Sequence, residues 1–306
     1  MKKAEGRTRT LANGRGLLAG LFVFFFLLFG GLSWWVIWSM SQAARETDTA
    51  PASEATGNPY TPQDARTLLL ITEDEGEAQG FVLIRMDPAQ SRIRTLSIPR
   101  ETALDSSQDS KRLFEVYETQ KGAGIGTYVE EVTGIAVDFY AVLPYEGMEE
   151  LLNQAGSGLS FTLPENLRYD MDGYTIRIDG GEQVLSATQV TDVLRYPAWN
   201  GGRQQRAAVQ AQIISACINQ YFTPATMEND AGYEACVAVA DTNLLREPYY
   251  QLRESLAYMA SRNTGTICQP LSVEGEYAGQ GDEIRFYLQK PIGTAVRNAF
   301  DVASIN

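Results

Sequence analysis

The 306-residue sequence contains no histidine. This absence excludes serine–histidine–aspartate and cysteine–histidine catalysis, and it excludes metal sites built on imidazole. Cysteine is scarce as well, because Cys217, Cys236 and Cys268 are too few and too widely spaced for a zinc cluster. Outside the cytoplasm an odd number of cysteines allows at most one disulfide, and the alternative is a set of buried, unpaired thiols.

Basic residues are few after the N-terminus. The chain carries a formal net charge of -13, although its first fifteen residues are basic and include Lys2, Lys3, Arg7, Arg9 and Arg15. A domain that neutralises the phosphates of nucleic acid needs a dominant positive field. We therefore predict no nucleic-acid partner, and any anion site in the remaining chain must be a local cluster of basic side chains.

A long apolar run follows this basic start. No charged residue occurs from Gly16 to Ala44, and Trp34, Trp35 and Trp38 lie near the end of the run. About 20 apolar residues cross a bilayer, with tryptophans at its interface and basic residues on the cytoplasmic side. We predict a cytoplasmic segment over residues 1–15, a transmembrane helix over 16–40, and a single-pass cell-membrane protein whose main domain is extracytoplasmic. The alternative is a cleaved signal peptide, whose apolar region is usually only about 7 to 15 residues long.

The sequence after residue 40 predicts a flexible linker followed by one folded domain. Residues 41–64 are rich in Ala, Thr, Ser, Glu and Pro and predict a flexible linker. Over residues 65–306, apolar runs typical of strands alternate with helical patterns, which predicts one α/β domain with helices on both faces of the sheet. The expected strands are 67–72, 81–86, 93–98, 136–143 and 283–288, and the expected helices are 113–121, 125–133, 145–154, 186–194, 203–221 and 244–261. Gly122, Gly134 and Gly156 stand where the first three of these helices should end. Apolar spacing in the last helix favours one core that includes residues 223–306.

The hexapeptide Ser97-Ile98-Pro99-Arg100-Glu101-Thr102 resembles the Ser-Ile-Pro-Arg-Asp-Thr motif of the LytR-CpsA-Psr family. Further similar blocks follow in the family's order, at residues 137–153, at 185–195, at Arg203 and Arg206, and at 241–244. The resemblance implies a three-layer α/β/α sandwich with a mixed central sheet, preceded by one transmembrane helix. It also implies an apolar channel for a polyprenyl chain.

The function that this resemblance implies is a membrane-anchored extracytoplasmic phosphotransferase of bacterial cell-wall assembly. Such an enzyme moves a glycopolymer from a polyprenyl pyrophosphate lipid to peptidoglycan. Guanidinium groups grip phosphate oxygens in pairs, so the candidate pyrophosphate-binding residues are Arg100, Arg195, Arg203 and Arg206. Arg100, Glu101 and Glu73 are the candidate catalytic residues.

The sequence departs from the family pattern where a metal is expected. The family's second strand usually opens with an Arg-x-Asp-Thr stretch, whose arginine and aspartate places are taken here by Glu77 and Gln79. Glu101 replaces another aspartate, and Pro197 replaces an arginine. The resemblance implies Mg²⁺, with Glu73 and Gln79 as candidate ligands, although an amide brings no charge. Two functions therefore stay open: an active, divergent transferase, and a catalytically silent member that binds polyprenyl-linked glycans as a sensor or scaffold.

Overall fold

The computed structural model describes residues 57–171 and 173–301. The predicted cytoplasmic segment, the predicted transmembrane helix and most of the predicted linker lie outside these residues. Within them, none of the helices combines the length and the apolar character that crossing a bilayer requires. The chain already contacts the domain a few residues before the expected boundary at residue 65, since the Asn58 amide donates to the carbonyl oxygen of Pro88 at 2.9 Å.

Six strands form a mixed central sheet in the order β10-β3-β2-β1-β4-β9. Strands β1, β3, β4 and β10 run in one direction, and β2 and β9 run in the other. Both faces of the sheet are covered, which explains why its central strands read as nearly continuous apolar runs in the sequence. The strand bounds are β1 Arg66–Asp74, β2 Glu77–Asp87, β3 Arg92–Ile98, β4 Phe139–Pro144, β9 Asp241–Thr242 and β10 Cys268–Ser272.

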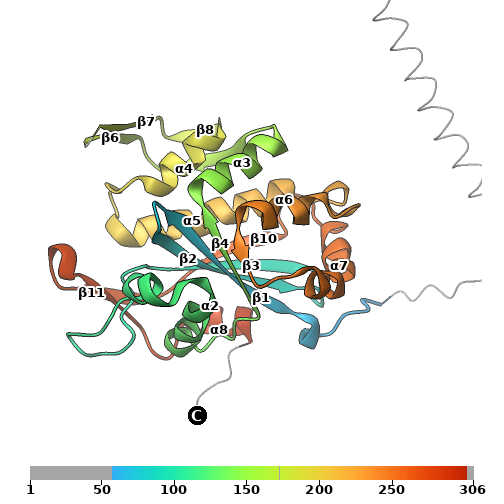
Figure 1. Ribbon diagram of the computed structural model, residues 1–306, viewed down its shortest axis with the longest axis horizontal. Coiled ribbons are helices and arrows are strands. Elements are labelled where there is room, and N and C mark those ends of the chain that lie inside the picture. The colour runs from blue at the N-terminus through green and yellow to red at the C-terminus, as the bar shows by residue number, and fades with distance from the viewer. Residues whose placement is uncertain (1–56, 172, 302–306) are drawn as a thin grey trace, which may run out of the picture. The chain divides into compact units, whose positions relative to one another are not determined.

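Helices cover the sheet on both faces (Figure 1). One face packs against α3 (Tyr145–Ala155), α4 (Ala187–Arg195), α5 (Gly202–Tyr221), α6 (Ala231–Val239) and α7 (Arg246–Ala260). The other face packs against α2 (Leu113–Thr133) and α8 (Thr294–Phe300). Two separate apolar cores result, one on each side of the sheet. The expected α/β domain with a mixed central sheet is confirmed.

Several short elements lie outside the central sheet, and the sequence predicted only one of them, the strand near residue 283. Short two-stranded ribbons join β5 (Leu159–Leu163) to β8 (Gly181–Leu185), and β6 (Leu167–Met171) to β7 (Tyr174–Ile178). A third ribbon pairs β11 (Gly275–Ala278) with β12 (Arg285–Leu288), so the strand expected near residue 283 lies outside the central sheet. Short 3-10 turns complete the described elements: η1 Pro62–Asp64, η2 Ala225–Met227 and η3 Gly281–Glu283.

The two helices expected over residues 113–121 and 125–133 form one kinked helix, α2. The kink lies at Lys121, whose backbone has φ 51° and ψ -164°. The residue directly after the kink is Gly122. Any larger residue would clash there, because a Cβ would lie 2.5 Å from the Tyr140 ring. The glycine signals at the ends of α2 and α3 are confirmed, since Gly134 and Gly156 both cap these helices in the left-handed conformation.

The C-terminal third shares the core of the domain, as the apolar spacing predicted. Strand β10 pairs with β3 in the central sheet, and α8 packs into the core on the α2 side. The three cysteines are free: Cys268 is buried, Cys217 is half-buried and Cys236 is exposed. The disulfide alternative is therefore wrong, and burial applies fully to Cys268 alone.

Candidate anion site at the carboxyl edge of the sheet

The candidate residues meet where the parallel strands of the sheet end. Strands β1, β3 and β4 run in the same direction, so their carboxyl ends lie at one edge, the usual place for ligands in open α/β sheets. Arg100 follows β3, and Arg195 lies in the last turn of α4. Arg203 and Arg206 lie in the first two turns of α5, where the helix N-terminus adds positive potential.

A tight hairpin and a bulge build this edge of the sheet. Glu75 and Gly76 form a two-residue turn with φ 50° and 87°, which joins β1 to β2. Just beyond the turn, Thr72 pairs with Gly80 and Glu73 pairs with Ala78, so Gln79 is an extra residue in β2. Bulges of this kind change the direction of a side chain. The bulge therefore decides where the Gln79 amide points.

Gly80 allows this bulge to pack against α5. A Cβ at Gly80 would lie 2.6 Å from Oε1 of Gln210, which is too close for any side chain to fit without a shift. Gln210 is buried, and its amide nitrogen donates to the backbone oxygen of Gln79 at 3.0 Å. The hydroxyl of Ser97 donates to the oxygen of the same Gln210 side chain at 3.3 Å. Gln210 thus fixes the bulge from the α5 side.

The Gln79 side chain connects two arginines. Its Oε1 accepts a hydrogen bond from Nη1 of Arg100 and another from Nη2 of Arg206, each at 2.9 Å. Both guanidinium groups therefore contact one uncharged oxygen. Burial, followed by the positive charge of Arg206, lowers the pKa of Arg100, whereas Glu101 and Glu77 oppose this shift. The two cations form a local positive cluster in an acidic domain.

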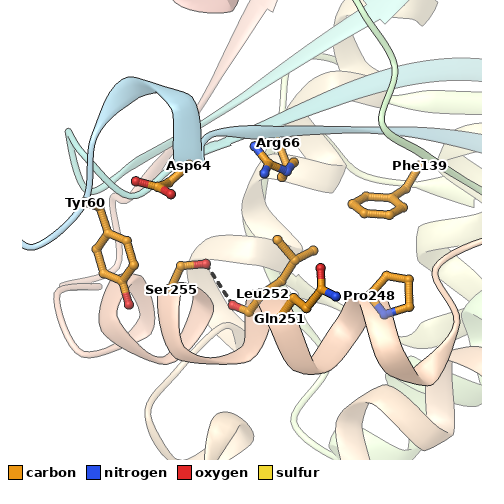
Figure 2. A pocket seen from close by; sticks show the side chains of 8 residues that line it. All are labelled: Tyr60, Asp64, Arg66, Phe139, Pro248, Gln251, Leu252 and Ser255. Atoms are coloured by element: carbon orange, nitrogen blue, oxygen red, sulfur yellow. Dashed lines mark hydrogen bonds between the residues drawn. The ribbon is translucent and has the colours of Figure 1, made fainter.

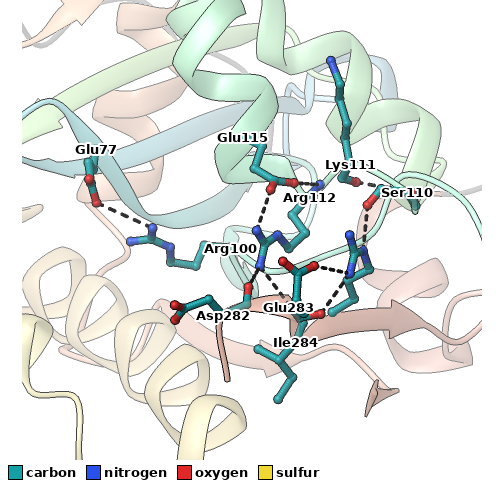
Figure 3. A network of polar contacts seen from close by, with 10 residues as sticks. Glu77, Arg100, Ser110, Lys111, Arg112, Glu115, Asp282, Glu283 and Ile284 are labelled. Atoms are coloured by element: carbon teal, nitrogen blue, oxygen red, sulfur yellow. Dashed lines mark hydrogen bonds and ion pairs between the residues drawn. The ribbon is translucent and has the colours of Figure 1, made fainter. Parts of the chain in front are cut away.

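Arg100 is held from two further sides. Its Nη2 lies 3.8 Å from a carboxylate oxygen of Glu77, which is 65% exposed, and Figure 3 shows this contact. The Phe114 ring lies close to two guanidinium groups, because the Cζ atoms of Arg100 and Arg112 are each 4.5 Å from its centroid. Arg112 in turn donates to Glu115 and to backbone oxygens of Asp282 and Ile284 (Figure 3). The C-terminal segment therefore supports the position of Arg100 indirectly.

Arg203 pairs with the neighbour of Arg100 in sequence. Its Nε donates to Oε1 of Glu101 at 3.2 Å. The Glu101 side chain is 12% exposed, and its backbone oxygen accepts from the Phe286 amide of β12 at 2.9 Å. Strand β12 thus fixes the backbone of the proline-arginine motif, which gives residues 223–306 a role that the sequence did not reveal.

Arg195 is held by a carboxylate that the sequence did not single out as its partner. Its Nε and Nη2 donate to the two oxygens of Asp74 at 3.0 and 2.8 Å. This paired hydrogen bonding raises the pKa of Arg195. Its Cζ also lies 4.9 Å from the ring centroid of Tyr145, a fully buried residue at the start of α3. Tyr145 links the two halves of the site, because burial raises its pKa while Arg206 and Arg195 oppose that rise.

Glu73 lies on the other face of the sheet from Arg195. The Tyr117 hydroxyl of α2 donates to its carboxylate. Burial, together with this hydrogen bond, raises the pKa of Tyr117. Adjacent residues of a strand point to opposite faces, so Asp74 faces α4 whereas Glu73 faces α2. The structure therefore does not bring Glu73 together with the arginines.

Two buried polar atoms beside the arginine cluster have no hydrogen-bond partner: Nε of Arg206 and the Tyr277 hydroxyl of β11. The Tyr145 hydroxyl instead faces the hydroxyl of Thr72, which opposes the rise in the pKa of Tyr145 that burial causes. Burial and the negative charge of Glu101 raise the pKa of Tyr277, and Arg203 and Arg206 oppose this shift. Unpartnered buried donors are rare in native proteins and call for an explanation such as a ligand or a water. Neither tyrosine carried a sequence signal, because a lone aromatic residue in a strand or helix is ordinary core material.

The LytR_cpsA_psr family model matches residues 39–291. The chain belongs to this family. A polyisoprenyl-teichoic acid–peptidoglycan teichoic acid transferase, TagU of Bacillus cereus, is 22% identical over 193 residues, which cover 60% of each chain. The chain thus matches less than two thirds of that relative's length.

Solved structures show the same LytR-CpsA-Psr fold. B. subtilis TagV is 18% identical with a TM-score of 0.61, and the match covers 78% of this chain and 98% of that one. B. subtilis TagT is 16% identical with a TM-score of 0.59, covering 79% and 94%. At these identities the likeness concerns the fold alone.

The residues present do not fit the magnesium ion that membership of the LytR-CpsA-Psr family implies. The oxygen of Gln79 lies between two cations, and the Glu73 carboxylate accepts from a tyrosine hydroxyl. Residues 57–171 and 173–301 contain no group of three or more acidic or thiol side chains that could hold a metal. As they are placed, Glu73 and Gln79 do not form a pair of magnesium ligands.

Two cavities in the described part of the chain lie apart from the candidate site, and neither is lined by Arg100, Arg195, Arg203 or Arg206. One, of about 110 Å³, lies between the start of β1 and helix α7 and is lined by Arg66, Leu252 and Ser255 among others (Figure 2). The other, of about 410 Å³, adjoins Arg168 and Arg177 on the β6–β7 ribbon. Neither corresponds to the apolar channel that the family resemblance implies. Val82 and Ile213 are fully buried in the core between the sheet and its helices.

Proposed function

We propose that this chain is a membrane-anchored extracytoplasmic phosphotransferase that attaches a glycopolymer from a polyprenyl pyrophosphate lipid to peptidoglycan. The observation that carries the proposal is the pair of guanidinium groups, Arg100 and Arg206, that meet at Gln79. Family membership and the teichoic acid transferase function of the B. cereus relative support a polyprenyl-linked glycopolymer as the substrate.

The chemistry requires little covalent work from the protein. A peptidoglycan hydroxyl attacks the phosphorus that carries the glycopolymer, the new phosphodiester bond forms, and polyprenyl phosphate leaves. Phosphoryl transfer depends mainly on positioning and charge stabilisation. In this proposal Arg100 and Arg206 hold the diphosphate, and Glu101, which pairs with Arg203, is the candidate acceptor of the hydroxyl proton.

Turnover by the full-length protein in detergent tests this proposal. A lipid-linked saccharide and soluble peptidoglycan fragments are the substrates, and the assay follows saccharide joined to the fragments. We expect product from the unaltered chain and a loss of about 100-fold for Arg100→Met, because charge-assisted contacts in a transition state contribute about 3 kcal/mol. The matched control is Arg297→Met, which removes a half-buried arginine of α8 that is not part of the arginine cluster.

A second candidate is a catalytically silent binding protein. The observation that favours it is Gln79, an uncharged residue at the place where the family pattern has an aspartate. Binding of a polyprenyl pyrophosphate that depends on Arg100, without any transfer to peptidoglycan fragments, would select this candidate. Absence of both binding and transfer would reject both functions.

A further inference from the structure

The charge balance around Gln79 differs from that of a metal site. A magnesium ion needs carboxylate oxygens to balance its charge, and it keeps close to octahedral geometry. Here the central oxygen belongs to an amide, and it already accepts hydrogen bonds from two guanidinium groups. The position that a cation would take next to Gln79 is therefore bordered by two positive charges.

The carboxylates nearby are engaged by other groups. Glu101 accepts from Arg203, and Asp74 accepts from Arg195 through both of its oxygens. Glu77 reaches Arg100 only at 3.8 Å and is largely exposed, where ion pairs contribute little. Arg100 and Arg206 thus have no close, buried carboxylate between them among the described residues. Their charge is left for an anion.

The buried donors around this pair indicate where that anion lies. Nε of Arg206 is buried without a partner, and so is the hydroxyl of Tyr277, whose ring packs against Phe286 with the centroids 4.9 Å apart. A diphosphate offers several acceptor oxygens, which matches a set of N–H and O–H donors and does not match a metal.

We infer that this chain binds the diphosphate of its substrate without a divalent cation, with Arg100 and Arg206 supplying the positive charge and the neutral Gln79 amide holding the two guanidinium groups in place. The inference rests on the proposed function, whose diphosphate ligand it adopts. A carboxylate at position 79 would offset part of the charge of the two guanidinium groups that contact it. The neutral Gln79 amide leaves that positive charge for the diphosphate.

Calorimetric titration of the full-length protein in detergent with inorganic pyrophosphate tests the inference. Titrations are run in EDTA and in excess Mg²⁺. We expect the affinity in EDTA to equal or exceed the affinity in excess Mg²⁺, because the two arginines are charged in both conditions whereas Mg²⁺ complexes free pyrophosphate in solution. Gln79→Glu keeps the length of the side chain and adds a charge, so its affinity in EDTA should fall about tenfold or more. Gln79→Ala removes the amide without adding charge and should stay within about fivefold of the unaltered chain.

A second readout follows the metal directly. Mn²⁺ gives a paramagnetic resonance signal that decreases on binding to protein, and we expect no decrease that depends on Gln79 in the unaltered chain. Pyrophosphate binding that requires Mg²⁺, or Mn²⁺ binding that Gln79→Ala abolishes, would overturn the metal-free site while leaving the proposed function intact. Absence of pyrophosphate binding in both conditions would overturn the proposed function and this inference together.

Discussion

Replacing Arg206 by methionine should change stability and ligand affinity in opposite directions. Two unit charges about 6 Å apart repel by on the order of 3 kcal/mol at an effective dielectric constant of about 20. Arg206 is partly exposed, so solvent screening reduces this to about 1 to 2 kcal/mol. The substitution also removes the unpartnered buried Nε, whose desolvation costs about 1 kcal/mol or more. The substitution also loses one hydrogen bond to Gln79, which stabilises the folded protein by about 1.5 kcal/mol.

The net expectation for Arg206→Met is a stabilisation of about 1 kcal/mol in the absence of ligand. In a domain of this size that raises the midpoint of thermal unfolding by about 2 to 4 °C. Pyrophosphate affinity should fall about 30-fold, because a charge-assisted contact of about 2 kcal/mol is lost. Scanning calorimetry measures the first effect, and isothermal titration with inorganic pyrophosphate measures the second.

Arg297→Met is the matched control for both measurements. Arg297 also has a buried Nε without a partner, but it lies on α8 and donates to Thr294. We expect pyrophosphate affinity to remain unchanged in this control. A lower unfolding midpoint for Arg206→Met with unchanged pyrophosphate affinity would refute the reasoning, because Arg206 would then be a structural residue with no unfavourable charge to relieve.

Three other substitutions test the packing of the domain and of the site. Gly80→Ala should destabilise the protein by about 1 to 3 kcal/mol in urea unfolding, because the new Cβ lies 2.6 Å from the Gln210 side chain, and unaltered stability would contradict the close packing. Asp74→Asn should cost about 1 kcal/mol in the same assay, because it removes the nearest of three carboxylates that face Arg195 and leaves Glu146 and Glu149 at 3.7 and 3.8 Å; a loss below about 0.3 kcal/mol would show that the pair contributes little. Ellman's reagent should label one thiol before the other two in the native protein, and this first phase should be absent after Cys236→Ser, because Cys236 is the exposed cysteine even though burial raises the pKa of its thiol; labelling of another thiol first would contradict the described burial.

The local backbone patterns could be predicted from the sequence because strands and helices impose short periods. Apolar runs predicted β1, β2 and β3, and the glycines at positions 134 and 156 predicted where helices end. The short ribbons over residues 159–185 were missed, because strands of five residues with one face exposed leave a weak pattern. The absence of histidine and the motif at residues 97–102 were also available from the sequence alone.

Which side chains meet was decided by the tertiary structure. Sequence spacing could name Arg100 and Arg206, which are far apart in the chain, but only the β2 bulge shows that both donate to Gln79. The pairing of Arg195 with Asp74, and the separation of Glu73 onto the α2 face, follow from the pleat of β1. A shift of one residue in a strand reverses the face of every side chain. The sequence therefore determined the types of group available to the site, and the register of the sheet determined which of them act together.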